Sequence, residues 1–425
     1  MITSRTRVIV VVLILAVASM GFAGGEQEAA GDGGETITIW VGGQVAELDD
    51  TWQAVEEGYE EETGNTVEVQ LFGFDVYYDK LLTALQGGSG PDLAFADLGG
   101  WVPTFAAEGW LMSMEDMISG WSDEDQIWDN LWPTVTYEDE RYGLPWYTDA
   151  RLLLYNKQLF RDAGLDPDDP PETWSELVDD ASAISELGPR TYGYGVSGTK
   201  TEHTSLAFIV FLASNGGQLL TDDYSEAAFN TEAGLEALEF YTDLALEHNV
   251  SPEPVSYHED DYRNLMAQGR VAMAIGGPWS FPLIEQANPD IDYSLDVHPY
   301  GEAPASVLGG WALVMPTTTE VPEAAWDFAQ YLTSYETWMF WIEEKGGPMP
   351  TRKDVADDAP ALQDEKWDNI FEVYPNAVSR PPIPEYPQVS EQIQLMIQSV
   401  LLGEKTPQEA MNDAEAEVNN ILGAE

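Results

Sequence analysis

The stretch from Thr36 to Leu71, TITIWVGGQVAELDDTWQAVEEGYEEETGNTVEVQL, decides the fold. Its first residues are rich in β-branched and aromatic side chains, which favours a strand. Apolar residues then recur at helical spacing (Trp52, Val55 and Tyr59), so an amphipathic helix follows. The segment 66–71 alternates apolar and polar residues, as a half-buried strand does. This order predicts a β-α-β unit, in which the helix joins two parallel strands.

The alternation of strands and helices continues to the end of the chain. Further strands are predicted at 93–96 and 152–155, and amphipathic helices at 78–85, 237–244, 325–332 and 393–400. Thr173 and Thr406 each stand three residues before a glutamate, which is the capping-box pattern of a helix start. In a chain of 425 residues, this alternation predicts an α/β fold with mostly parallel sheets, divided into two lobes.

The composition excludes several classes of function. Lys and Arg number 17 and Asp and Glu 76, which gives a formal net charge of −59. Such a charge repels phosphate backbones, so no nucleic-acid partner is expected. The absence of cysteine excludes disulfides, thiol catalysis and iron–sulfur clusters. Because concentrated salt screens self-repulsion, the acidic composition predicts a salt-loving source organism.

Residues 1–23 have the pattern of a cleaved signal peptide. Two arginines precede the apolar run 8–17, and residues 21–23 read small-x-small. That run is shorter than the roughly 20 residues that a membrane-spanning helix needs, although an uncleaved anchor remains the alternative. Residues 24–35 are predicted to be a flexible acidic linker. Since no cysteine is available for lipidation, we expect a periplasmic or extracellular protein.

No catalytic motif is recognisable. The segment 193–200 resembles a phosphate-binding loop, but an extra residue separates its last glycine from the lysine. The four histidines show no metal-ligand spacing. With 76 carboxylates, apparent acid–base pairs arise by chance. We therefore predict no enzymatic activity, no cofactor and no metal, and an extracellular glycan-active enzyme is the alternative.

Aromatic residues beside glycine, proline or carboxylates give a stronger signal. They follow predicted strands in DLGGW (97–101), LPWYTD (144–149), GGPW (276–279) and GGW (309–311). In open α/β sheets, ligands bind outside the carboxyl ends of strands. Trp or Tyr can cover the C–H face of a sugar ring, while charged side chains bond its hydroxyls. The pattern favours a carbohydrate site, and core packing of the tryptophans is the alternative.

From Thr36 onward the chain resembles the extracellular solute-binding proteins of bacterial sugar ABC transporters, a group that includes maltose-, trehalose- and glycerol-phosphate-binding proteins. The matching stretches occur in the order of that family and cover essentially the whole chain after residue 35. They are GSGPDLAF (88–95), YGLPWYTD (142–149), LYNK (154–157), SNGG (214–217), AQGRVAM (267–273), GPW (277–279), GGW (309–311), PTRK (350–353) and RPPIPEY (380–386).

The resemblance implies a two-lobed periplasmic-binding-protein fold of type II, whose lobes close on the ligand about a hinge. The expected lobes are 36–147 with 300–334, and 148–299 with 335–425. The expected crossings between them lie near 145–150, 297–301 and 334–341. The implied partners are a mono- or oligosaccharide and the permease subunits of an ABC transporter, with the receptor itself a monomer.

The resemblance also implies ligand contacts. They are Asp97 as a hydroxyl-binding carboxylate, Tyr147 and Asp149 beside the hinge, Trp279 as a stacking platform, Gly310 and Trp311 in a loop over the ring, Arg380 as a basic contact, Glu47 as a looser match and Trp101 as an extra wall. We expect Asp97 and Trp279 to face an open cleft, so that alanine there weakens binding without unfolding the chain. The same fold with a peptide, polyamine or sugar phosphate as ligand is a further alternative.

Overall fold

The computed structural model describes residues 34–43, 49–345, 349–363, 365–374 and 377–424. All of them belong to one compact unit, Gly34–Glu425. The predicted signal peptide, most of the predicted linker and Glu47 lie outside the described residues. Among the helices of the described part, none is both long and apolar enough to cross a membrane.

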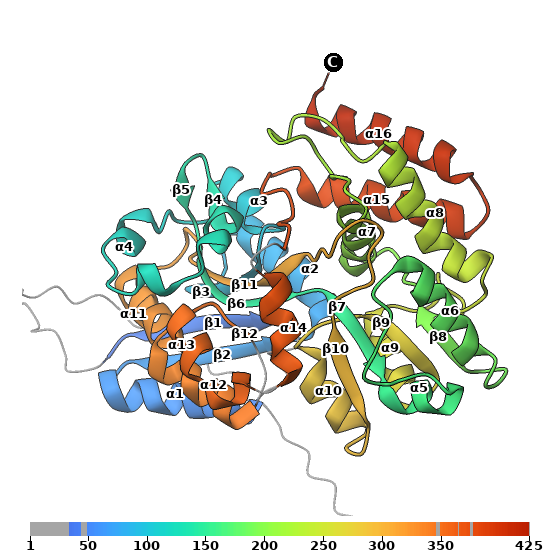
Figure 1. The fold of residues 1–425 in the computed structure, drawn as a ribbon. Helices are drawn as coiled ribbons and strands as arrows, with labels where there is room; N and C mark the ends of the chain where they lie inside the picture. Colours follow the sequence, from blue (N-terminus) through green and yellow to red (C-terminus); the bar gives the residue numbers. More distant parts are fainter. Residues whose placement is uncertain (1–33, 44–48, 346–348, 364, 375–376, 425) are drawn as a thin grey trace, which may run out of the picture. The chain divides into compact units, whose positions relative to one another are not determined.

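The first sheet has six strands in the order β12-β6-β11-β3-β1-β2 (Figure 1). Their bounds are β1 (Thr36–Gly42), β2 (Thr66–Phe72), β3 (Leu93–Asp97), β6 (Leu144–Ala150), β11 (Leu308–Val314) and β12 (Met349–Pro350). Strand β1 pairs in parallel with β2 and β3, and helix α1 (Asp49–Thr63) connects β1 to β2. The predicted β-α-β unit is therefore confirmed.

The second sheet has four strands in the order β10-β7-β9-β8. They are β7 (Leu152–Asn156), β8 (Tyr192–Gly195), β9 (Val271–Gly276) and β10 (Tyr293–Asp296), and a separate hairpin contains β4 (Thr136–Tyr137) and β5 (Glu140–Arg141). Only β8 and β9 are parallel in this sheet. Both sheets are thus mixed, where mostly parallel sheets were predicted. In the first sheet the reason is that the chain leaves through β6 and returns through the neighbouring β11, so these strands run in opposite directions.

Helices flank both sheets (Figure 1). Up to the second sheet they are α2 (Phe74–Gln86), α3 (Val102–Ala107) and α4 (Glu115–Ser119), with the 3₁₀ turns η2 (Glu124–Gln126) and η3 (Asp129–Val135). They continue with α5 (Lys157–Ala163), α6 (Trp174–Ser185), α7 (Glu202–Ser214), α8 (Glu232–Leu246), α9 (Glu259–Ala267) and α10 (Ser280–Ala287). The last are α11 (Pro322–Leu332), α12 (Tyr335–Lys345), α13 (Lys353–Asp358), η4 (Pro360–Gln363), α14 (Glu365–Val373), α15 (Tyr386–Leu401) and α16 (Pro407–Leu422). The predicted capping boxes at Thr173 and Thr406 begin α6 and α16.

Helix α12 packs with the first sheet, which differs from the predicted lobe boundary at residue 334. The rings of Trp338 and Trp341 lie 5.0 and 5.4 Å from that of Trp146 in β6. Strand β12 then pairs with β6. Helix α12 and strand β12 therefore complete the core around Trp146, because burying these indoles removes a large apolar area from water.

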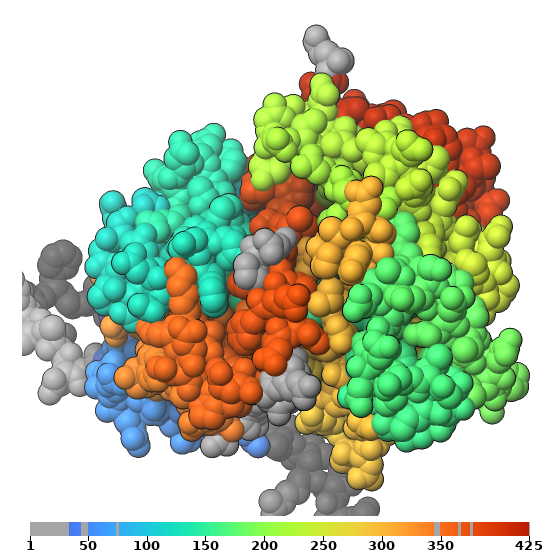
Figure 2. Space-filling view, in the orientation of Figure 1, coloured from blue at the N-terminus to red at the C-terminus, as the bar shows by residue number. Residues whose placement is uncertain are grey.

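Within its described residues, the chain passes between the two sheets at three places. It leaves β6 and enters β7 at Arg151, and it returns between β10 and β11. The third passage lies between strand β12 and helix α15, and not at the predicted 334–341, because α12 and β12 still pack with the first sheet. Helix α14, within this passage, contacts β10, and Figure 2 shows the orange-red chain of this region beside the yellow-orange chain around β10. The three passages are adjacent, because Arg151 N–H donates to the Val307 carbonyl and Val378 N–H donates to the Ser306 carbonyl.

Candidate ligand-binding site

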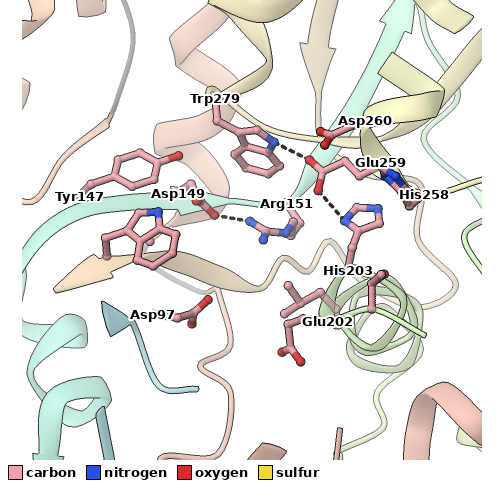
Figure 3. Close-up of a pocket in the computed structure, with 14 residues that line it drawn as sticks. Asp97, Tyr147, Asp149, Arg151, Glu202, His203, His258, Glu259, Asp260 and Trp279 are labelled. Carbon is pink, nitrogen blue, oxygen red and sulfur yellow. Dashed lines mark hydrogen bonds and ion pairs between the residues drawn. The ribbon is translucent and has the colours of Figure 1, made fainter. Parts of the chain in front are cut away.

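A pocket lies between side chains carried by the two sheets and their helices (Figure 3). From the first sheet it is lined by Asp97 of β3, Tyr147 and Asp149 of β6, and Gly310 and Trp311 of β11. The rest of its lining is Arg151, Thr201, Glu202, His203, Leu206, His258, Glu259, Asp260 and Trp279. Most of this second group stands on α7, on α9, or on the turn between β9 and α10.

Six of the nine predicted ligand contacts line this pocket: Asp97, Tyr147, Asp149, Trp279, Gly310 and Trp311. Trp101 stands outside the lining and packs on Trp311, with ring centroids 5.5 Å apart. Arg380 is buried beside Asp97 and is not part of the lining. Glu47 lies outside the described residues. That these residues bind a ligand remains a prediction.

Strand β11 brings the first-sheet residues together. Trp311 is directly opposite both Asp97 of β3 and Tyr147 of β6. Gly310 has φ of +131°, and a Cβ there would lie 2.1 Å from the carbonyl oxygen of Tyr147. Any other residue would force β11 and β6 apart, so glycine is required for this register. The sequence motif GGW is thus explained by the backbone as well as by the tryptophan.

Asp97 is held by a buried cation. One terminal nitrogen of Arg380 donates to the Asp97 carboxylate and to the carbonyl oxygen of Leu98. The other donates to Glu202 Oε1 at 3.2 Å. Burial raises the pKa of Asp97 to about 6, although the Arg380 guanidinium opposes this rise. Ionised carboxylates are strong acceptors, so Asp97 can bond a ligand hydroxyl near neutral pH.

Trp279 is fixed on two sides. Its indole N–H donates to the Glu259 carboxylate, and the Arg151 guanidinium carbon lies 4.4 Å from the ring centroid. Only 7% of Trp279 is exposed, so it is more enclosed than the predicted open-cleft position. The second oxygen of Glu259 lies 3.0 Å from Nδ1 of His203. Burial acts to raise the pKa of Glu259, but His203 and nearby arginines outweigh it and lower the pKa to about 2.

The sequence reasoning missed the charged residues on the second-sheet side. Arg151 donates to Asp149 and stacks on Trp279, and it stands at the first passage between the sheets. The sequence does carry a signal for Arg151, because this charged residue interrupts the otherwise apolar segment 150–154 just after LPWYTD. Glu202, His203 and Glu259 carry no such signal, because they begin ordinary helices and become neighbours only through the fold.

Carboxylates outnumber cations around the pocket. Five acidic side chains line it: Asp97, Asp149, Glu202, Glu259 and Asp260. The arginines nearby are already paired with carboxylates, Arg151 with Asp149, Arg263 with Asp260, and Arg380 with Asp97 and Glu202. An anionic ligand would meet repulsion, whereas a neutral ligand with many hydroxyls would find acceptors and aromatic faces. Within the described ranges, no group of three or more His, Asp or Glu side chains is placed to hold a metal ion.

Comparisons with known proteins agree with this architecture. Residues 42–337 match the sequence model of the family described as bacterial extracellular solute-binding protein. The crystal structure of an ABC transporter solute-binding protein from Thermotoga lettingae TMO, bound with α-D-tagatose, is 65% identical, with a TM-score of 0.89 over 92% of this chain and 100% of that one. Maltose-bound MalE3 of T. maritima is 26% identical, with a TM-score of 0.81 over 91% and 99%. The arabinooligosaccharide-binding protein of Halalkalibacterium halodurans is 25% identical over 81% of this chain and 80% of that protein.

Proposed function

Since the chain belongs to the bacterial extracellular solute-binding protein family, we propose that it is a carbohydrate receptor that delivers its ligand to an ABC-transporter permease. The observation that carries the proposal is the pocket in which aromatic rings and carboxylates from both sheets face one cavity. Trp279 and Trp311 offer apolar faces, and Asp97 and Asp149 offer acceptors, which is the complement of a sugar ring.

We propose a small neutral sugar as the ligand, in the first instance a ketohexose. The relative that is 65% identical holds α-D-tagatose. The excess of carboxylates in the lining supports the choice, because it disfavours sugar phosphates and sugar acids. Arg380 does not alter this argument, since its charge is already shared between two carboxylates.

Delivery requires the two lobes to close on the ligand. We propose that one lobe contains the described elements from β1 to β6 and from β11 to β12, and the other those from β7 to β10 together with α15 and α16. Because the lining comes from both, a bound sugar adds contacts only when the lobes are together, and this shifts the population to the closed state. The receptor is proposed to act as a monomer outside the cytoplasm after removal of residues 1–23, and to catalyse no reaction.

Calorimetric titration of the purified mature chain in molar salt tests the proposal. Saturable 1:1 binding of D-tagatose or another neutral sugar, without turnover of the sugar, is the expected result. Galacturonate and fructose 6-phosphate serve as anionic comparisons and should bind weakly. Hydrolysis of chromogenic glycosides would favour the glycan-active enzyme, and a failure of every neutral mono- and oligosaccharide to bind would refute the receptor.

A further inference from the structure

We propose that Arg380 is a positioning residue, which keeps the pocket carboxylate Asp97 ionised and orients both Asp97 and Glu202 toward the ligand without contacting the ligand itself. This inference rests on the proposed function of the pocket. It differs from the role that the resemblance implied for Arg380, which was a direct contact.

The geometry of the guanidinium carries the proposal. The Arg380 side chain is only 1% exposed and does not line the pocket. One terminal nitrogen bonds to Asp97 at the end of β3, and the other bonds to Glu202 in the first turn of α7. Arg380 itself stands on the third passage between the sheets. A single planar cation therefore joins a carboxylate of the first-sheet side to one of the second-sheet side.

The residues around Arg380 leave space for its guanidinium group and hold its partner Glu202 in place. At Gly100 a Cβ would lie 3.1 Å from an Asp97 oxygen and 3.2 Å from an Arg380 terminal nitrogen, so a larger residue would press on the ion pair. Glu202 receives two further bonds, from the Tyr386 hydroxyl at 2.7 Å and from the Ser390 hydroxyl at 2.6 Å. Arg380, Tyr386 and Ser390 together fix the orientation of Glu202.

Without the Arg380 cation, the Asp97 carboxylate would lose the positive charge that offsets its repulsion by the Glu202 carboxylate. Like charges that share a site repel, so Asp97 would then hold a proton more readily or turn away. The charged and titratable groups that act on Asp97 are Arg380, Glu202 and Arg151, with Tyr386 next to them and with Tyr147 and His203 in the same lining. Of these, Arg380 and Arg151 favour the ionised carboxylate, and only Arg380 bonds to it.

The experiment compares Arg380→Met and Arg380→Lys with a matched control, Arg352→Met. Arg352 is also buried and also bridges two carboxylates, Asp123 and Asp354, but it lies outside the pocket lining. Each variant is first checked for folding by circular dichroism. Affinity for D-tagatose, or for the first neutral sugar that saturates the wild type, is then measured from pH 5 to 9.

We expect Arg380→Met to weaken binding at pH 7 by about tenfold or more, because ligand hydroxyls lose an ionised acceptor. The pH below which affinity falls should move upward relative to the wild type. Arg380→Lys keeps the charge and should restore part of the affinity. Arg352→Met should lower the melting temperature with the affinity unchanged.

A readout without sugar separates this inference from the proposed function. Carboxyl ¹³C NMR titration, with the Asp97 signal assigned from Asp97→Asn, should show a higher Asp97 pKa in Arg380→Met than in the wild type. An unmoved Asp97 pKa would overturn the inference even if binding is lost. The inference would also be overturned if Arg380→Lys bound sugar as weakly as Arg380→Met while its Asp97 pKa equalled that of the wild type. That result would assign Arg380 to direct ligand contact. If no neutral sugar binds the wild type, the proposed function fails while the titration still decides the inference.

Discussion

Asp97 gives the pocket a pH dependence close to neutral pH. Its pKa is raised to about 6, chiefly by burial. The folded chain therefore takes up a proton at Asp97 as pH falls through 6, whereas the unfolded chain does so only near the ordinary aspartate pKa of 3.8. Ionisation of Asp97 thus costs stability above pH 6, and this cost is absent at pH values below the unfolded pKa.

Sugar affinity should fall as pH is lowered through 6, because a protonated carboxyl is a weaker acceptor than a carboxylate. Calorimetry between pH 5 and 8 measures this change. The matched control is Asp180→Asn, since the pKa of Asp180 is also raised to about 6 but Asp180 lies on α6, outside the pocket lining. Affinity that is flat across pH 6 in the wild type would contradict a hydroxyl-binding role for ionised Asp97.

Trp279 is expected to matter for both binding and stability. Trp279→Ala should weaken sugar binding by about 1–3 kcal/mol, by analogy with the stacking of nucleic-acid bases on aromatic side chains. It should also lower the melting temperature, because the ring is enclosed between Arg151 and Glu259. Trp338→Phe, a change in the core of the first sheet, is the control that should lower stability alone. Normal affinity in folded Trp279→Ala would place Trp279 in the core and not in the site.

At the scale of single elements, helix α6 permits a test of local sequence rules. Its capping box joins Thr173 and Glu176 reciprocally, as the sequence predicted. Thr173→Ala removes the side-chain acceptor at the helix start and should cost about 1 kcal/mol in the free energy of unfolding. Urea denaturation measures the cost, and sugar affinity should not change because neither residue lines the pocket. Thr173→Ser keeps an acceptor and should behave as the wild type.

Elements governed by local patterns could be predicted from the sequence, and so could the parallel pairing of β1 with β2 across their connecting helix. The packing of elements that are distant in the sequence could not. The alternation in TVEVQL and the spacing of Trp52 and Val55 depend on neighbours within one turn or strand, and β2 and α1 appear where expected. The side on which α12 packs depends on the distant Trp146, and no local signal reports it. The same holds for Glu202 and Glu259, which join the site only after α7 and α9 have packed.

For the whole molecule, the formal charge of −59 dominates solution behaviour. Carboxylates crowd one another in places, as at Asp180, where burial and then Asp179 and Glu176 raise the pKa. Added salt shortens the screening length from about 10 Å at 0.1 M to about 3 Å at 1 M, and so weakens this repulsion. The melting temperature should therefore rise between 0.05 and 1 M KCl, which differential scanning fluorimetry can follow. A melting temperature that does not change with KCl would contradict a salt-adapted surface.

Closure of the lobes is the last prediction, and its physical basis is the arrangement of the three passages between the sheets. They are held side by side by backbone bonds, from Arg151 N–H to the Val307 carbonyl at 3.3 Å and from Val378 N–H to the Ser306 carbonyl at 2.8 Å. A few residues of these three passages can then absorb a rotation of one lobe against the other, while both sheets remain intact. Saturating sugar should reduce the radius of gyration in small-angle X-ray scattering, because contacts from both lobes favour the closed state. The Asp97→Ala variant, whose sugar binding is weakened, should show a smaller reduction in the radius of gyration at the same sugar concentration. An unchanged radius of gyration in the saturated wild type would reject closure by rotation about these passages and leave the two-sheet fold unaffected.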